Sequence, residues 1–235
     1  MFLQNAISKR INDDNPVKVA LIGAGKFGSM FLSQVPSTLG IEVLVIADLK
    51  PDNAVKACKN VGWSDDLINK TKFVDRGTDA IKLNEVEVVI EATGFPAAGI
   101  EHARQAFQNG KHIIMVNVEA DVLAGAALVK EANSAGVVYS MAYGDQPALT
   151  AEIVEWARAS GFNVTSAGKG TRYQPIYHKS SPDTVWDYYG LTHEEAKKAG
   201  MNPKMFNSFL DGTKSGLEMA AIANACDLDV PTNGL

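Results

Sequence analysis

An apolar stretch that breaks into regularly spaced glycines, Val17 to Gly28, constrains the fold of this chain more than any other feature. Its first half is β-branched or aliphatic almost without interruption, which is typical of a strand buried on both faces of a parallel sheet. Its second half has the GxGxxG spacing, and apolar residues at helical spacing follow it. The stretch therefore predicts a strand that turns sharply through glycine into a helix.

The predicted turn is suited to bind the pyrophosphate of a dinucleotide. Backbone N–H groups converge at a helix N-terminus, where the helix dipole also favours an anion. Gly23 would permit the tight turn, Gly25 would let the backbone approach the phosphates, and Gly28 would let the helix pack close to the strand. Lys26 and Phe27 lie between these glycines and complete the candidate binding loop. The alternative is a glycine turn that holds no ligand.

The next apolar run, Ile41 to Ala47, predicts a second buried strand, and Asp48 follows it about 20 residues after the last glycine. A carboxylate at this position accepts the ribose 2′-OH of NAD, and it repels the 2′-phosphate of NADP unless a cation lies nearby. Lys50 could be that cation, so the sequence leaves NAD and NADP open. In the alternative interpretation, Asp48 caps the helix that begins at Pro51.

Predicted strands and helices alternate over residues 1–142. After the first two strands, we expect helices at 52–61, 79–83, 96–109 and 126–135 and strands at 72–74, 86–92, 111–116 and 137–141. Such alternation with short connections predicts an α/β fold with a parallel, doubly wound sheet of the Rossmann type, which binds ligands across the carboxyl ends of its strands. At such ends, Thr93, Gly94 and Asn117 are expected to face an NAD(P) cofactor.

Composition restricts the partners and the location of the chain. The 22 basic and 27 acidic residues give a net charge of −5 with no run of like charges, which argues against nucleic acid or an anionic membrane as partner. Cys58 and Cys226 have neither CxxC nor metal-ligand spacing, so we expect inert core thiols in a reduced, cytoplasmic protein. Residues 1–15 suit an amphipathic helix rather than a signal peptide, and no segment is long enough to cross a membrane. A homo-oligomer is expected.

The pattern changes near residue 143. A long amphipathic helix is expected to run to Ser160 and a strand to cover residues 162–168, whereas residues 169–203 have the composition of a loop. We therefore expect a second, smaller α+β region over residues 143–235 that binds the substrate and carries the catalytic residues. This region has too little regular structure to close a full sheet, so the chain is expected to be incomplete.

Basic side chains and aromatic rings gather at residues 169–189. Arg172, Tyr173 and His178 in this stretch predict a lid over a small anionic substrate, because cations pair with carboxylate or phosphate groups and aromatic rings exclude water. The alternative is a solvated loop with a few core aromatics. No pair of histidines in the chain has metal-ligand spacing.

A second group of candidate catalytic residues lies on a predicted helix. Lys214 and Glu218 are four residues apart, so their side chains share a helix face and can pair. A positioned lysine beside a nicotinamide site could carry the alcohol proton or polarise the carbonyl group. We expect Lys214 and Lys169 to bind or polarise the reacting oxygen, with Asp211 and Glu218 orienting them. The alternative is an ordinary surface ion pair.

The combined motifs resemble the homoserine dehydrogenase family, in the branch that carries a C-terminal SAF-type domain. The motifs are Gly23 to Gly28, Gly110-Lys111-His112, Asn117-Val118-Glu119-Ala120-Asp121, Ala167-Gly168-Lys169-Gly170, Pro182-Asp183-Thr184-Val185-Trp186, and Asn202-Pro203 through Asp211-Gly212-Thr213-Lys214-Ser215. The same branch is similar to a second type of 1-deoxy-xylulose 5-phosphate reductoisomerase and to dehydrogenases of sugar acids. The resemblance implies an NAD(P)-dependent oxidoreductase acting on CH–OH groups. It also implies that a C-terminal part of the branch is lacking here.

Two departures from the family pattern bear on the substrate. Homoserine dehydrogenases usually have a catalytic lysine after the asparagine that ends the fifth strand, and this chain has Val118 there. Their later helix typically carries an aspartate and, four residues on, a lysine, whereas Lys214 and Glu218 exchange these charges. With these departures, the resemblance implies a hydroxylated, anionic substrate instead of homoserine.

Two alternative functions remain open. One is reductoisomerisation of a sugar phosphate with the help of Mg²⁺, which Glu119, Asp145, Asp211 and Glu218 could hold, since magnesium binds through few protein carboxylates. The other belongs to a different class of protein, an NAD(P) sensor that binds the dinucleotide without chemistry. Turnover that depends on Mg²⁺ would indicate the first, and tight binding without turnover the second.

Overall fold

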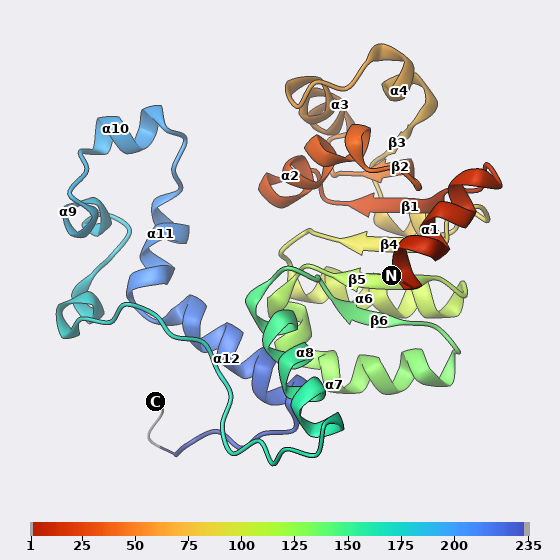
Figure 1. The fold of residues 1–235 in the computed structure, drawn as a ribbon. Helices are drawn as coiled ribbons and strands as arrows, with labels where there is room; N and C mark the ends of the chain where they lie inside the picture. Colours follow the sequence, from red (N-terminus) through yellow and green to blue (C-terminus); the bar gives the residue numbers. More distant parts are fainter. Residues whose placement is uncertain (1, 233–235) are drawn as a thin grey trace. The chain divides into compact units, whose positions relative to one another are not determined.

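The computed structural model describes residues 2–232 and divides into two compact units, Met1–Ala142 and Tyr143–Leu235. The first unit contains a six-stranded, all-parallel sheet with the strand order β3-β2-β1-β4-β5-β6 (Figure 1). The strands are β1 (Val17–Ile22), β2 (Ile41–Ala47), β3 (Lys72–Val74), β4 (Val88–Glu91), β5 (His112–Met115) and β6 (Tyr139–Met141). This is the doubly wound order, which reverses between β1 and β4 and leaves a ligand crevice at their carboxyl ends. The predicted Rossmann-type α/β fold is confirmed.

Helices precede and connect these strands in the alternation that the sequence predicts. They are α1 (Phe2–Asn12), α2 (Lys26–Gln34), the 3₁₀ helix η1 (Val35–Ser37), α3 (Pro51–Asn60), α4 (Asp65–Lys70), α5 (Gly77–Ile81), α6 (Pro96–Gln108) and α7 (Val118–Ser134). Among residues 2–232, no helix has both the length and the apolar character that crossing a membrane requires.

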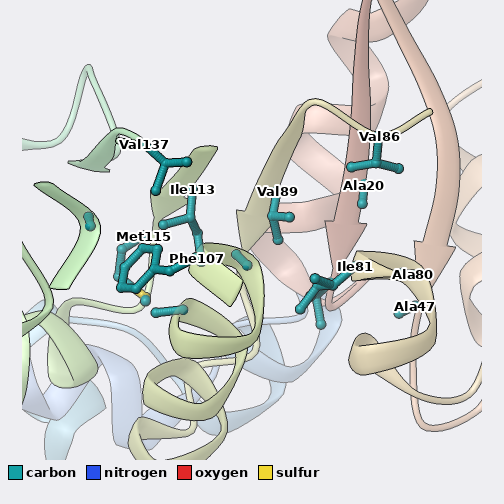
Figure 2. Packing of buried hydrophobic residues seen from close by; sticks show 14 of the residues in the cluster. Ala20, Ala47, Ala80, Ile81, Val86, Val89, Phe107, Ile113, Met115 and Val137 are labelled. Carbon is teal, nitrogen blue, oxygen red and sulfur yellow. The ribbon is translucent and has the colours of Figure 1, made fainter. Parts of the chain in front are cut away.

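Strand β1 shows how the sheet is buried on both faces. Ala20 and Ile22 belong to the hydrophobic cluster formed with α5, α6 and α7, part of which Figure 2 shows, whereas Val19 and Leu21 belong to the cluster on the opposite face with α2, α3 and α4. Successive side chains of a strand point to opposite faces, so the apolar run Val19 to Ile22 within β1 must be covered on both faces. The continuous apolar runs of the sequence therefore fix the layer arrangement.

Helix α7 begins at Val118, eight residues before the expected start at Ala126. Asn117 caps it, because its side-chain oxygen accepts a hydrogen bond from the amide of Ala120 at 3.1 Å. The expected start is wrong because Gly125 does not break the helix. Within the helix, the Asp121 carboxylate occupies the space next to Gly125, so the glycine is an interior helix residue.

Helix α4 (Asp65–Lys70) was not expected from the sequence. Its N-cap is Ser64, whose hydroxyl oxygen accepts a hydrogen bond from the amide of Leu67 at 3.2 Å. A serine followed by two acidic residues is a helix-start signal, but the six residues of α4 are too few to show a helical repeat.

The described part of the second unit, residues 143–232, contains helices and no β-strand. The helices are α8 (Gln146–Ala159), the 3₁₀ helix η2 (Pro175–Lys179), α9 (Val185–Tyr189), α10 (His193–Lys198), α11 (Pro203–Leu210) and α12 (Thr213–Cys226). The strand expected over residues 162–168 is wrong, and with it the β part of the expected α+β region. Val164 and Ala167 instead cover the apolar cluster of α8 and α12. Residues 169–203, expected as loop, contain η2, α9 and α10.

The aromatic residues expected to form a substrate lid serve largely as a small core within the second unit. Trp186 is buried with Val185 and Ala196, and its ring centroid lies 5.3 Å from that of Phe206. Tyr177 is also buried and contacts Tyr188 edge-to-face. For these rings, the alternative interpretation as core residues is the correct one.

Cys58 and Cys226 are both buried and free, as the sequence indicates. Burial raises the pKa of the Cys58 thiol to about 11 and also raises the pKa of the Cys226 thiol. A raised pKa lowers the thiolate fraction, to about one in a thousand at pH 8 for Cys58, and only the thiolate reacts rapidly with disulfide reagents. We therefore expect neither thiol to be titrated by such a reagent at pH 8 until denaturant is added. Rapid modification of the native protein would contradict this expectation.

Candidate functional site

A cavity of about 520 Å³ lies at the carboxyl edge of the sheet in the first unit. It is lined by the segments that follow β1, β2, β3 and β4 and by the first turns of α6. The polar, charged and glycine residues that the site uses are Gly23, Gly25, Asp48, Asp75, Arg76, Gly77, Thr93, Glu101 and His102. The volume lies within the range of small-molecule sites, and the position is the crevice expected of a doubly wound sheet. Four of the predicted cofactor residues, Gly23, Gly25, Asp48 and Thr93, therefore line one cavity.

The three glycines of the predicted loop have different surroundings. Gly23 has φ +97°, and a Cβ atom there would lie 2.8 Å from the carbonyl oxygen of Ala92. A Cβ atom on Gly28 would overlap the carbonyl oxygen of Gly23, so this glycine allows α2 to begin directly against the turn. Gly25 has nothing within 4 Å of its would-be Cβ. The loop is therefore closed on the protein side and open at Gly25, as close approach of a ligand requires.

Asp48 lies on the cavity wall and is hydrogen-bonded to the glycine loop. Its Oδ2 accepts from the amide of Ala24 at 3.2 Å, and its Oδ1 accepts from the amide of Lys50 at 3.0 Å. Its carboxylate thus fixes the turn and the start of the segment that leads into α3. The Lys50 side chain is exposed and does not line the cavity, whereas Arg76, which follows β3, does line it. The cation at the cavity is therefore an arginine that the sequence did not single out, and not Lys50.

A polar network extends below the cavity from Thr93. The Thr93 hydroxyl donates to Glu91 Oε1 at 2.5 Å and accepts from the amide of Phe95 at 3.3 Å. His102 Nδ1 lies 3.2 Å from the same Glu91 oxygen. One carboxylate therefore holds two side chains that line the cavity.

Sequence reasoning missed Arg76, Glu91 and His102. Arg76 lies two residues after the end of β3, so the sequence places it at the carboxyl edge of the predicted sheet, near Asp48 after β2. Glu91 is the last residue of β4, whose other residues are all apolar, so an acidic residue at this position is a visible signal. His102 gives no local signal, because only the fold brings α6 beside the cavity.

The other predicted cofactor residues lie outside the lining of the cavity. Lys26 and Phe27 are exposed in the first turn of α2, and Gly94 has φ +67° in the loop after β4. Asn117 is 2% exposed, and its amide group is engaged in the α7 cap and in a 3.5 Å contact with the Thr93 hydroxyl. The Asn117 side chain is thus a buried helix cap beside Thr93, and its contact with the cofactor stays a prediction.

In the second unit, Glu218 joins the two lysines that the sequence singled out. Its Oε1 lies 3.2 Å from Lys214 Nζ, and its Oε2 accepts a hydrogen bond from Lys169 Nζ. Glu218 is 4% exposed, whereas the Lys214 side chain is partly exposed. A buried carboxylate shared by two cations is not an ordinary surface ion pair, and it leaves one unit of positive charge in excess. The group can therefore hold an oxygen atom or an anion at the lysines.

Asp211 has a different role from the one expected. Its Oδ1 accepts from the amide of Thr213 at 2.9 Å, and its Oδ2 accepts from Asn207 Nδ2 at 2.9 Å. The carboxylate thus links α11 to the start of α12. It positions the helix that carries Lys214 rather than the lysine side chain itself.

The three predicted substrate-binding residues, Arg172, Tyr173 and His178, are all exposed. The Tyr173 hydroxyl lies 3.0 Å from His178 Nε2, and their rings meet edge-to-face with centroids 5.4 Å apart. The structure therefore brings two of the three together. Their role toward a substrate stays a prediction.

Among residues 2–232, no three or more histidine, cysteine, aspartate or glutamate side chains group so that they could hold a metal ion. The expected gathering of Glu119, Asp145, Asp211 and Glu218 around Mg²⁺ draws on residues of both units and stays a prediction.

Comparison with solved structures supports the fold. A homoserine dehydrogenase from Thiobacillus denitrificans matches 92% of this chain and 50% of its own length, with 16% identity and a TM-score of 0.61. A myo-inositol dehydrogenase from Lactobacillus casei, solved with NAD(H) and myo-inositol, matches 72% of this chain and 50% of its own, with 16% identity and a TM-score of 0.50. This chain thus spans half the length of each. No curated protein matches it.

Two family descriptions match successive parts of the chain. Residues 144–235 match the catalytic domain of oxidoreductase DRL, and residues 23–142 match the NAD binding domain of homoserine dehydrogenase. The second of these matches covers more than half of the chain and contains every residue that lines the cavity apart from Ile22. The chain therefore belongs to the family of homoserine dehydrogenase NAD-binding domains.

Proposed function

We propose that the chain acts in an NAD(P)-dependent oxidoreductase that transfers hydride to or from a small hydroxylated, anionic substrate. The observation that carries the proposal is the cavity at the carboxyl edge of the sheet, which is open at Gly25 and bounded by Asp48. The family match over residues 23–142 supports the same cofactor class.

The residues present fit a dinucleotide. The open space at Gly25 lies at the N-terminus of α2, a nine-residue helix whose first N–H groups and dipole favour a pyrophosphate. Asp48 can accept a ribose hydroxyl, since each carboxylate oxygen keeps a lone pair after its bond to the backbone. When bound, the nicotinamide cofactor supplies or accepts the hydride.

The lysine pair in the second unit supplies the acid–base chemistry in this proposal. Lys214 would donate a hydrogen bond to the reacting oxygen and hold the proton that the alcohol gains or loses. Glu218 keeps both lysines in place through its two oxygens, and Lys169 adds a second positive charge beside the developing oxyanion.

A substrate with anionic groups fits this part of the chain better than homoserine. The excess positive charge at Lys169 and Lys214 suits an anion, and Arg172 and His178 add further basic groups in the same unit. The match of residues 144–235 to the catalytic domain of oxidoreductase DRL supports oxidoreductase chemistry in this part of the chain. We also propose a cytoplasmic homo-oligomer, on the sequence composition alone.

The proposal is tested by measuring NAD(P) binding and turnover of the whole protein across hydroxy acids, semialdehydes and sugar phosphates. Binding with turnover of an anionic substrate supports it. Tight binding without turnover would indicate the sensing protein instead, and turnover of a phosphorylated ketose only with added Mg²⁺ would indicate the reductoisomerase.

Replacing Asp48 by asparagine is expected to shift cofactor preference toward NADP. The change removes the carboxylate that repels a 2′-phosphate but keeps an oxygen that can accept from the Ala24 amide. Removing one like charge at about 4 Å is worth about 1–4 kcal/mol, so the NADP-to-NAD ratio of kcat/KM should rise at least about fivefold. Asp52→Asn, an exposed change in α3, is the matched control. An unchanged NADP-to-NAD ratio of kcat/KM would contradict a contact between Asp48 and the ribose.

A further inference from the structure

Glu91 lies at the end of β4 with no exposed surface, directly beneath the proposed cofactor cavity. Its Oε1 accepts from the Thr93 hydroxyl at 2.5 Å and lies 3.2 Å from His102 Nδ1. Its Oε2 is buried without a hydrogen-bond partner. Burying a carboxylate in this way is costly. The Glu91 carboxylate is buried at this cost and contacts two residues that line the cavity, so we expect it to have a functional role.

The contact with Glu91 fixes the orientation of the His102 ring. Because Nδ1 faces Glu91, Nε2 lies at the opposite end of the imidazole, on the side of Gly77. A Cβ atom on Gly77 would lie 2.5 Å from Nε2, so only glycine leaves room for the ring there. Both residues line the cavity, and in the described part of the chain Nε2 has no hydrogen-bond partner. The ring therefore presents one polar atom that a ligand can use.

The position of this atom indicates which half of a dinucleotide it would meet. The cavity reaches Asp48 after β2 and Asp75 to Thr78 after β3, on the side of β1 away from β5 and β6. The carboxylate that follows the second strand of this fold contacts the adenosine ribose. A ligand atom near Gly77 therefore belongs to the adenosine half.

We propose that His102 binds the adenosine half of the cofactor through Nε2, and that buried Glu91 is a positioning residue that fixes the imidazole for this contact. The inference rests on the proposed function, because it needs a dinucleotide in the cavity. It adds a ligand residue that is absent from the glycine loop and from the predicted sites. An imidazole held at one nitrogen by a carboxylate presents the other nitrogen in a fixed direction, which lowers the entropy cost of binding.

Two substitutions at His102 separate its two nitrogens. In His102→Asn, the short amide can keep the bond to Glu91 but carries no polar atom at the Nε2 position. In His102→Gln, the longer amide can reach that position. By calorimetry on the whole protein, we expect His102→Asn to weaken NAD, ADP-ribose and AMP about three- to tenfold, the value of one hydrogen bond. We expect His102→Gln, which keeps a polar atom at the Nε2 position without the bond to Glu91, to bind more tightly than His102→Asn and less tightly than wild type.

The outcomes distinguish the inference from the proposed function. If wild type binds none of the three ligands, the proposed function fails and this inference with it. If wild type binds and His102→Asn binds equally well, only the inference is overturned. A loss for NAD that ADP-ribose and AMP do not show would also overturn it, since the contact would then lie outside the adenosine half. Thermal unfolding of each variant identifies any loss that is due to misfolding.

The positioning role of Glu91 is tested by a double-mutant cycle for AMP affinity. Glu91→Gln keeps the size and an acceptor for Thr93 but loses the charge. If Glu91 acts through His102, Glu91→Gln should weaken AMP in the wild-type background and change nothing further in His102→Asn. Independent losses that multiply would overturn the positioning role, because a merely structural effect of Glu91 does not depend on the residue at position 102.

Discussion

Replacing Lys214 by alanine is expected to lower kcat/KM about 10²–10⁴-fold, the loss typical of a general acid or base. The Lys214 ammonium group lies 3.2 Å from Glu218 Oε1, and the Lys214 side chain is partly exposed, so it is both oriented and accessible to a ligand. The dissociation constant of NAD(P) should not change, because every residue that lines the proposed cofactor cavity lies between Ile22 and His102. Steady-state kinetics and cofactor titration on the same preparation measure both quantities.

Lys204→Ala is the matched control for this prediction. Lys204 is a lysine of the same unit, exposed on α11, and its alanine variant should retain wild-type kinetics. Lys169→Ala should also reduce turnover, since Lys169 shares the carboxylate of Glu218. A Lys214→Ala enzyme within about threefold of wild-type kcat/KM would contradict a role in proton transfer.

The parallel sheet could be predicted from the sequence because its signals are local. Most strands are rich in aliphatic residues, such as β1, β2 and β4, and the glycine turn after β1 needs no long-range information. The second unit gave weaker signals. Residues 162–165 alternate between apolar and polar types like a strand, but no strand of the described chain pairs with them, and Val164 packs on α8 and α12 instead. Alternation alone does not say what covers an apolar face.

The predicted site residues give local signals in the sequence, whereas a missed one such as His102 depends on contacts between distant parts of the chain. Gly25 and Asp48 follow strands at fixed offsets, so topology places them at the cavity without any detail of packing. His102 reaches the cavity only because α6 passes beside Gly77, a contact between distant parts of the sequence. Lys169 and Glu218 were named for local reasons, yet their contact spans 49 residues of sequence. Residue type identified them, and only the fold brought them together.

The buried positions of Glu91 and Glu218 illustrate a limit of reasoning from residue type. Charged residues are expected at the surface unless they are paired, so a lone glutamate in the sequence is first taken as solvated. Both glutamates instead lie at 0% and 4% exposure and hold basic or polar side chains that border solvent or a cavity. In each unit, one buried carboxylate thus orients the groups that the proposed function uses.

Replacing Gly25 by alanine is expected to weaken NAD(P) binding about 5- to 150-fold while leaving the free energy of unfolding nearly unchanged. The new methyl group would meet no protein atom within 4 Å, and the backbone there (φ −70°) suits alanine. It would instead occupy the space through which the pyrophosphate approaches the loop. A misplaced methyl group costs about 1–3 kcal/mol, which converts to the stated loss of affinity.

Gly23→Ala provides the contrast that makes the Gly25 prediction specific. Its methyl group would lie 2.8 Å from the Ala92 carbonyl oxygen at φ +97°, so this variant should lose at least about 1–2 kcal/mol of stability in addition to binding. Gly216→Ala, another glycine with open surroundings, should change neither cofactor affinity nor stability by more than about 1 kcal/mol. Equal affinity of Gly25→Ala and wild type for NAD(P) would contradict a pyrophosphate site at this loop, because the added methyl group stands where the ligand must come closest.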